Sequence, residues 1–424
     1  MASVPNIIFY ILVFLSVYVQ VFFLLTFLEN RKKIIIRNGE IKLTKYPAVT
    51  IVVPSWNEEQ TVYRTVRSLL DLNYPKDKLK IFLVDDGSTD GTWNILRKFE
   101  KPARPNGRSG GYPNIKIFQK ENGGKYTALN LGLEHAETDF FGCLDADSYA
   151  EPESLVRLMS YFEKDPSIMA VAPSVTVDNP KNFIQNAQKA EYHMGVYTKK
   201  MLGFLGAINV TPGPLTIFRK KVFDDLGPYT HGHNTEDMEI AYRMQKNDYK
   251  IEHCNDAFVY TNTPTTIKKL YKQRLRWIYG FINNTIDYRD VLFKKKYGNF
   301  ALFTLPTGIV SILAVSYLFG RIIYNLGDFL YSKIIQFNTT GFNFSVKNSS
   351  LDLFFINTNS ALFLVAFIYS LVIFAIIFGR KMAEGKWTFS FNMFYFLILF
   401  RILAPFWFLK AVLNTLLKRK PAWR

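Results

Sequence analysis

Four long apolar segments constrain the fold of this chain more strongly than any other feature of its sequence. Residues 5–28 form the first segment, and residues 300–324, 361–379 and 391–412 form the other three. An α-helix needs about 20 predominantly apolar residues to cross the hydrocarbon core of a bilayer. The sequence therefore predicts a membrane protein that carries a separate domain between its first and second apolar segments.

We predict four parts along the chain. A transmembrane helix at 1–30 precedes an α/β domain at 46–263, an interfacial helix follows at 264–290, and a membrane region of about three segments occupies 300–424. Basic residues 31–33 directly follow the first apolar segment. The positive-inside rule then places the N-terminus outside the cell membrane and the α/β domain in the cytoplasm.

The chain is strongly basic, with 52 Lys and Arg against 35 Asp and Glu. Such an excess is typical of proteins that bind nucleic acid or an anionic membrane. The basic clusters at 31–33, 294–296 and 418–420 adjoin apolar segments, so we expect a lipid bilayer and no nucleic acid as the partner. Four spans would place the basic C-terminus outside, against the positive-inside rule. A re-entrant or interfacial last segment, which contains Arg401 and Pro405, is the alternative.

Short apolar runs alternate with helical patterns in the first half of the α/β domain. The predicted strands are 50–53, 81–84, 115–118 and 140–144, and helices are predicted at 58–71 and from about residue 90. This alternation indicates a mostly parallel sheet with helices on both faces. Ligands of such sheets bind outside the carboxyl ends of the strands, which is where the polar clusters of this sequence fall.

Two longer helices are predicted near the membrane. Residues 181–205 have helical spacing with lysines among the apolar positions, which fits an interfacial helix or a core helix equally. A helix at about 264–286 contains Gln273-Arg274-Leu275-Arg276-Trp277. One face of this helix can present Gln273, Arg276 and Trp277 together. An arginine can pair with a diphosphate and an indole can stack on a sugar, although a basic helix on lipid headgroups is the alternative.

Asp145 and Asp147 follow the predicted strand at 140–144. Two carboxylates this close repel each other, and each is costly to desolvate. A hard divalent cation removes that cost, and Mg²⁺ in particular uses one or two protein carboxylates together with substrate phosphates. An exposed turn that carries two acids by chance is the alternative.

Asp86 and Lys125 are candidates for nucleotide binding. Neither a G-x-G-x-x-G sequence nor a Walker lysine pattern surrounds them, so a nucleotide would not be held as in dehydrogenases or P-loop enzymes. Asp86 could accept hydrogen bonds from a base or a ribose. Lys125 opens a predicted helix after Gly123 and Gly124, where a positive charge opposes the helix dipole unless an anion lies nearby. A diphosphate would supply that anion.

Thr235-Glu236-Asp237 begins a helix predicted at about 235–246. Thr235 as the N-cap, followed by acids in the first turn, is a sufficient structural explanation. The functional interpretation makes Asp237 a base that takes a proton from an acceptor hydroxyl.

Together these motifs resemble the membrane-integrated inverting glycosyltransferases of family 2, which include cellulose, chitin, hyaluronan and poly-N-acetylglucosamine synthases. The matching residues are Pro54, Asn57-Glu58, 85–90, Gly124-Lys125, Asp145-Ala146-Asp147, 235–237 and 273–277. The short membrane region looks most like that of the bacterial poly-N-acetylglucosamine synthases. The resemblance implies an α/β fold of the GT-A (Rossmann-like) type, with interfacial helices and an α-helical transmembrane domain.

The resemblance also implies roles for individual residues. Those expected to contact the donor are Pro54, Asn57, Glu58, Asp86, Lys125, Asp145, Gln273, Arg274 and Arg276. Asp147, with Asp145, would bind Mg²⁺ or Mn²⁺. Asp237 would be the general base, beside Glu236 in the same catalytic motif. The acceptor would contact Trp277 and the loop formed by Thr211, Pro212 and Gly213.

The implied activity is processive transfer of sugar, with inversion, from a UDP-sugar to a growing polysaccharide that crosses the membrane. UDP-N-acetylglucosamine and UDP-glucose are the leading donors, and any secretion partner is unknown. Two alternatives remain: a single transfer onto a glycolipid acceptor, and a non-catalytic membrane scaffold or sensor. Product size distinguishes the first alternative from a polymerase.

Overall fold

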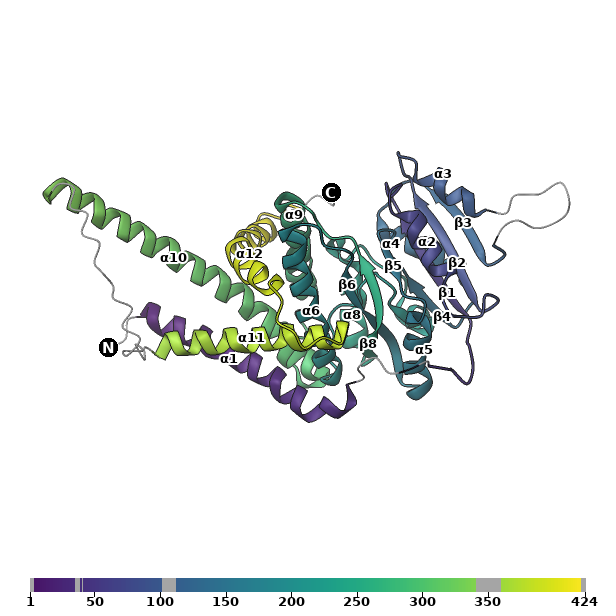
Figure 1. The fold of residues 1–424 in the computed structure, drawn as a ribbon, viewed down its shortest axis with the longest axis horizontal. Helices are drawn as coiled ribbons and strands as arrows, with labels where there is room; N and C mark the ends of the chain where they lie inside the picture. The colour runs from purple at the N-terminus through teal and green to yellow at the C-terminus, as the bar shows by residue number, and fades with distance from the viewer. Residues whose placement is uncertain (1–3, 35–38, 40, 101–111, 341–359, 421–424) are drawn as a thin grey trace.

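The computed structural model describes residues 4–34, 39, 41–100, 112–340 and 360–420. Residues 1–3, 341–359 and 421–424, which belong to the predicted membrane regions, lie outside the described residues. Figure 1 shows an α/β body built on one sheet. Long helices extend from the body on the side away from β1, β2 and β3. The α/β architecture expected from the sequence is therefore present.

One sheet of eight strands organises the described part of the α/β body, in the order β3-β2-β1-β4-β7-β6-β8-β5. The strands are β1 (Val49–Ser55), β2 (Leu79–Asp86), β3 (Ile115–Lys120), β4 (Phe140–Cys143), β5 (Ser148–Ala150), β6 (Ile168–Val177), β7 (Ile217–Arg219) and β8 (Lys250–Thr261). Strands β3, β2, β1 and β4 run parallel. Their carboxyl ends therefore meet at one edge, where the cleft described below opens.

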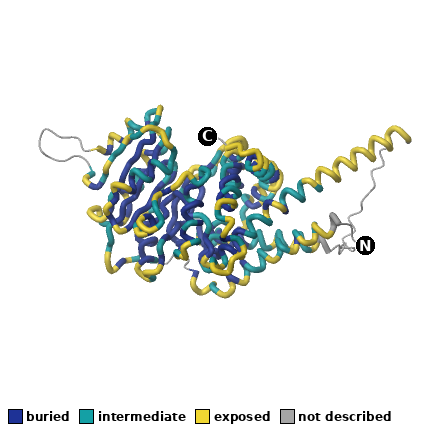
Figure 2. Tube along the Cα trace, turned by 180° about the vertical axis from the view of Figure 1, so that it is seen from behind, coloured by how far each residue is buried: buried dark blue, intermediate teal, exposed yellow. Residues whose placement is uncertain are grey.

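The inner parallel strands β1, β2 and β4 are buried on both faces, and their successive side chains point to opposite sides of the sheet. The edge strand β3 is partly exposed. Ile51 and Val53 pack under α2 (Val62–Leu70), α3 (Thr92–Leu96) and α5 (Ser154–Lys164). Val52, between them, packs with α4 (Lys125–Glu134), α6 (Phe183–Phe204) and α8 (Glu236–Lys246). Figure 2 shows the strands as the most buried part of the molecule. Helices on both faces were predicted, and this prediction is confirmed.

The second half of the sheet was not predicted. β7 runs antiparallel to both β4 and β6, and β5 runs antiparallel to β8. β5 and β7 are three residues long, too short for a periodic pattern. β8 buries the polar residues His253, Asn255 and Asp256, so its sequence lacks the apolar alternation of an ordinary strand. The sheet is consequently more mixed than the sequence indicated.

The helix predicted at 58–71 begins only at Val62. The backbone N–H groups of Asn57 and Glu58 donate instead to the hydroxyls of Ser88 and Thr92, at 3.0 and 2.7 Å. These bonds join the loop after β1 to the loop after β2. The side chain of Glu58 therefore lies in a loop at the sheet edge rather than on a helix.

Four helices of the described residues are long and apolar enough to cross a membrane. They are α1 (Val4–Asn30), α10 (Leu305–Thr340), α11 (Ser360–Glu384) and α12 (Asn392–Leu416). α10 extends the segment predicted at 300–324 and projects away from the body in Figures 1 and 2. α12 is one continuous helix through Pro405, so a break at this proline is not observed.

α6 and α9 (Ile267–Asp287) lie between the sheet and the apolar helices. α6 packs against α11 and α12, and α9 packs against α12. A Cβ atom on Gly379 of α11 would lie 1.8 Å from the carbonyl oxygen of His193 in α6, so the two helices touch backbone to backbone. α7 (Lys221–Leu226) completes the body. The helices predicted at 181–205 and 264–286 thus form the layer that joins the sheet to the apolar helices.

Candidate active site

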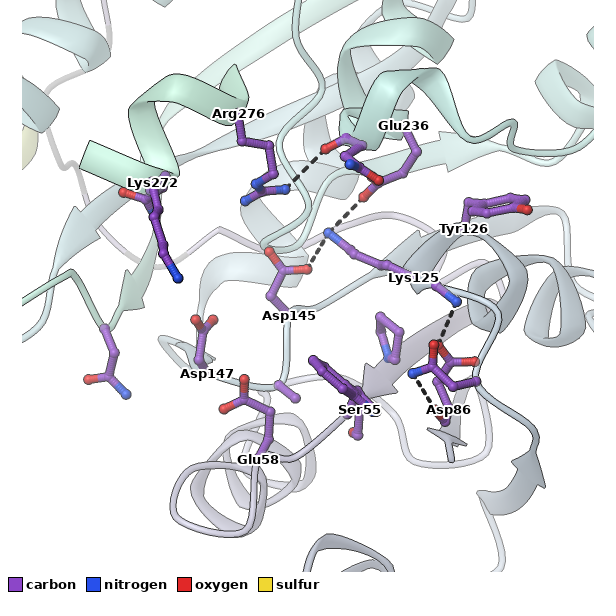
Figure 3. Close-up of a pocket in the computed structure, with 18 of the residues that line it drawn as sticks. Ser55, Glu58, Asp86, Lys125, Tyr126, Asp145, Asp147, Glu236, Lys272 and Arg276 are labelled. Carbon is purple, nitrogen blue, oxygen red and sulfur yellow. Dashed lines mark hydrogen bonds and ion pairs between the residues drawn. The ribbon is translucent and has the colours of Figure 1, made fainter. Parts of the chain in front are cut away.

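A cleft of about 890 Å³ opens at the carboxyl edge of the parallel strands. Its walls come from the ends of β1 and β2, the loop before α4, the segment after β4, the start of α8 and the first half of α9. Figure 3 shows side chains from these elements converging on one space. Most are polar, which suits a charged ligand better than an apolar one.

Asp86 ends β2 and is buried in the wall of the cleft. Its carboxylate accepts hydrogen bonds from the backbone N–H groups of Gly123 and Gly124, at 3.1 and 2.9 Å, and from Lys120 Nζ at 2.6 Å. Gly124 has a φ of +91°, a conformation that a residue with a side chain rarely adopts. The Asp86 carboxylate therefore joins β2 to the loop before α4. Asp86 also lines the cleft.

Lys125 begins α4 and reaches across the cleft. Its Nζ lies 2.6 Å from Asp145 Oδ1 and 3.0 Å from Glu236 Oε1. Burial opposes the charge on Lys125, but the two carboxylates outweigh burial and raise its pKa well above the ordinary value. The negative charge expected near the start of α4 is thus supplied by two protein carboxylates. The two contacts of Lys125 also join the segment after β4 to the start of α8.

Asp147 and Glu58 face the same part of the cleft as Asp145 (Figure 3). Burial, together with the charges of Asp145 and Glu58, raises the pKa of Asp147 to about 7. The described residues contain no group of three or more His, Cys, Asp or Glu that could hold a metal ion by itself. Two crowded carboxylates that need a positive charge fit a hard cation that takes its other ligands from a phosphate.

Glu236 and Asp237 begin α8. The hydroxyl of Thr235 donates to the carbonyl of Gly232 at 2.7 Å and makes no capping bond to the helix, so the predicted N-cap interaction is absent. Burial, followed by the charge of Glu236, raises the pKa of Asp237 to about 6. A carboxylate with such a pKa is a better proton acceptor near neutral pH than an ordinary aspartate.

The loop of Thr211, Pro212 and Gly213 connects the two acidic segments. Thr211 donates from its N–H and its hydroxyl to the carbonyl of Asp237, at 3.1 and 2.8 Å. A Cβ atom on Gly213 would lie 2.4 Å from Lys125 Nζ and 2.6 Å from Asp145 Oδ1. The loop therefore holds the backbone at Asp237 and leaves room for the Lys125–Asp145 ion pair.

The pentapeptide 273–277 lies in α9 and divides between two environments. Gln273 and Arg276 line the cleft. Arg274 instead forms an ion pair with Glu191 of α6, donates to Gln273 Oε1 at 2.6 Å, and lies over the ring of Trp277 at 4.1 Å. Neither Arg274 nor Trp277 is among the described residues that line the cleft. Arg274 thus joins α9 to α6.

The other predicted site residues are distributed as follows. Pro54, Glu58, Asp86, Lys125, Asp145, Asp147 and Glu236 line the cleft, whereas Asn57, Asp237 and the 211–213 loop do not. Asn57 accepts a hydrogen bond from the N–H of Thr89 at 2.8 Å, so its amide supports the loop after β2. The backbone carbonyl of Asp237 accepts both hydrogen bonds from Thr211, so Asp237 lies next to the 211–213 loop.

Sequence reasoning missed several cleft residues. These are Ser55, Trp56, Asn122, Tyr126, His231, Asn234, 262–265, Lys269 and Lys272. Lys269 and Lys272 precede Arg276 by seven and four residues on α9, so the helical spacing that joined Gln273 to Arg276 could have found them. The segment 262–265 follows β8, a strand with no clear sequence signal, and its position depends on the sheet.

Two family models match the chain. "Glycosyl transferase family 2" matches residues 50–227, and "Glycosyl transferase family group 2" matches residues 140–417. A poly-β-1,6-N-acetyl-D-glucosamine synthase of Staphylococcus epidermidis is 28% identical over 312 residues, which cover 73% of this chain and 72% of that protein. The synthase of Staphylococcus aureus (strain COL) is 28% identical over 281 residues, 66% of this chain and 65% of that protein.

A solved structure also resembles most of this chain. It is a mannosyltransferase from Pyrobaculum calidifontis in complex with GDP-mannose and Mn²⁺, with a TM-score of 0.55 and 17% identity. The match covers 96% of this chain and 99% of that one. At this level of identity, the likeness shows a common fold for the α/β body and its apolar helices.

Proposed function

The chain belongs to glycosyltransferase family 2, and we propose that it transfers N-acetylglucosamine from UDP-N-acetylglucosamine to a growing polysaccharide. The GT-A fold and the enzyme class expected from the sequence are confirmed. The names of the staphylococcal relatives support this donor and product. The observation that carries the proposal is the contact of Lys125 with both Asp145 and Glu236, because it joins a donor-binding sheet edge to the segment of the general base.

The donor occupies the cleft in this proposal. Pro54, Glu58 and Asp86 lie nearest the uridine, and Lys125, Gln273 and Arg276 contact the diphosphate. The cleft lining supports this assignment, and Lys269 and Lys272 add positive charge to the same helix face. Asn57 and Arg274 support these residues through Thr89 and Gln273. Their proposed effect on the donor is therefore indirect.

Asp145 and Asp147 would hold a divalent cation, Mg²⁺ or Mn²⁺. The raised pKa of Asp147 supports this, because a cation would relieve the repulsion among the carboxylates. The Mn²⁺ in the complex of the Pyrobaculum calidifontis mannosyltransferase, which has the same fold, also supports it. When bound, such an ion neutralises charge on the diphosphate and so helps UDP to leave.

Asp237 then acts as the general base. It takes the proton from an acceptor hydroxyl while that oxygen attacks the anomeric carbon from the side opposite UDP. The bond from the anomeric carbon to the diphosphate breaks, and Lys125 and Arg276 stabilise the departing UDP. Thr211 and Gly213 shape the acceptor side, and Trp277 stacks on the terminal sugar. The configuration at the anomeric carbon is inverted.

The protein is a membrane polymerase in this proposal. The catalytic domain lies in the cytoplasm against the plasma membrane, and the product leaves between the apolar helices. The packing of α6 and α9 against α11 and α12 supports this, because it places the layer that carries Gln273–Trp277 beside candidate membrane spans. Processive extension follows if the product enters that path while its end stays at Asp237.

A panel of UDP-sugars tests the proposal with purified, detergent-solubilised protein. We expect UDP release with UDP-N-acetylglucosamine, loss of release with excess chelator, and recovery with Mg²⁺ or Mn²⁺. Gel analysis of radiolabelled product should show a ladder. One short, lipid-extractable product would support single transfer instead, and no UDP release from any sugar would contradict the enzyme assignment.

The pH dependence of kcat/KM should report the state of Asp237. Since burial and Glu236 raise the pKa of this carboxyl to about 6, the base is protonated and inactive below that pH, and the rate should rise as the pH passes through it. Glu236→Gln removes a neighbouring negative charge. We therefore expect its acid limb to lie at lower pH than that of the wild type, whatever the maximum rate. An unshifted limb would assign it to another group.

A further inference from the structure

The segment that precedes the proposed base has an unusual backbone. Gly232, His233 and Asn234 have φ values of +48°, +54° and +64°. Side-chain-bearing residues rarely adopt this left-handed region, and successive examples need support from their surroundings. Asp237 follows this segment by three residues. The contacts that hold the segment in this conformation therefore help to set the position of the proposed base.

One face of α9 provides that support. Arg276 Nη1 donates to the carbonyl of Asn234 at 3.1 Å. Asn284 Nδ2 donates to the carbonyl of Gly232 at 3.2 Å and to Thr235 Oγ1 at 3.0 Å. Asp287 Oδ2 lies 2.7 Å from His233 Nε2. Arg276, Asn284 and Asp287 share a helix face by their spacing, and Asn284 is fully buried.

Gly280 lies between these residues on the same face. A Cβ atom on Gly280 would lie 2.3 Å from Thr235 Oγ1 and 2.5 Å from Thr235 Cγ2. A glycine at this point is therefore what allows α9 to approach the segment closely enough for Arg276 and Asn284 to bond to it. The nearest side-chain atoms belong to Thr235, two residues before Asp237.

We propose that the α9 face of Arg276, Gly280, Asn284 and Asp287 is a brace that positions the general base, with Gly280 and Asn284 as positioning residues. The inference rests on the proposed function, in which Asp237 is the base. Arg276 belongs both to the brace and to the lining of the donor cleft. Its guanidinium thus connects the donor diphosphate to the segment that carries Asp237.

Asn284→Ala tests the brace because it removes the hydrogen bonds to Gly232 and Thr235, and neither of these partners lines the cleft. A misplaced catalytic group can cost up to about 100-fold in rate, so we expect kcat to fall about 10- to 100-fold. UDP affinity, binding stoichiometry and Tm should stay near wild type. A general loss of folded protein would lower the UDP stoichiometry as well, so this split separates positioning from instability.

Gly280→Ala is the second variant, and Gly320→Ala in α10 is its matched control, since a Cβ at Gly320 meets no atom within 4 Å. We expect Gly280→Ala to lower kcat more than UDP affinity. Thr235→Ser removes the methyl group that would lie 2.5 Å from the new Cβ and keeps the hydroxyl, so it should recover part of the loss in the double variant. Wild-type kcat in both Asn284→Ala and Gly280→Ala would overturn the brace. A wild-type protein that releases no UDP from any sugar would instead overturn the proposed function.

Discussion

Replacing Asp237 by asparagine is expected to lower sugar transfer by about 10²- to 10⁴-fold, the usual contribution of a positioned general base. Asparagine has almost the same shape but cannot accept the acceptor's proton. Asp237 does not line the cleft in which we propose that the donor binds, so the affinity for UDP should change little. Transfer is measured as UDP release together with labelled product, and UDP binding by calorimetry.

Asp224→Asn is a suitable control for this variant. Asp224 lies on α7, and its side chain is exposed. The Asp224→Asn substitution removes the same charge from the protein as Asp237→Asn and does not alter a residue that lines the cleft. Unchanged turnover in Asp237→Asn would contradict the assignment of the base. Loss of UDP binding along with turnover would place Asp237 on the donor side instead.

Gly213→Ala should have the second large effect. The added Cβ would meet Lys125 Nζ at 2.4 Å and both oxygens of Asp145 at 2.6 and 2.7 Å. These atoms are the ends of flexible side chains and can move without unfolding the protein. The movement would separate Lys125 from Asp145 and would disturb the contact of Lys125 with Glu236. Because displacement of catalytic groups by about 1 Å can cost about 10²-fold, we expect a loss of that order in transfer.

Thermal unfolding and UDP affinity identify the cause of that loss. We expect a Tm close to wild type and weaker UDP binding, since Lys125 contacts the proposed diphosphate site. Gly320→Ala, with open space at its Cβ, should match wild type in every measurement. Full activity in Gly213→Ala would show that the Lys125–Asp145 contact is not needed in the reaction.

Much of the fold followed from local patterns. The four strands predicted between residues 50 and 144 correspond to β1, β2, β3 and β4, because each is an apolar run bounded by turn residues. The four apolar segments appear as α1, α10, α11 and α12. The family was recognised because separate motifs occur in a set order, although each motif alone is weak.

Other features depended on partners distant in the chain. The sequence predicts that Lys125 pairs with a diphosphate, yet the carboxylates of Asp145 and Glu236 lie beside its amino group. Arg274 was grouped with Arg276, yet it pairs with Glu191 of α6. Residues two apart on a helix point in different directions, so Arg274 and Arg276 were bound to differ in their surroundings. That Arg274 contacts α6 could be known only from the packing of α6 against α9.

By itself, the sequence determined the parallel half of the sheet, the candidate membrane helices and the set of acids, because apolar periodicity and segment length are local properties of the chain. Only the tertiary structure decided which of those groups meet. It brought Gly213 against the Lys125–Asp145 pair and Gly280 against Thr235. Such contacts join residues far apart in the chain. The sequence around a glycine does not show which distant side chains pack against it.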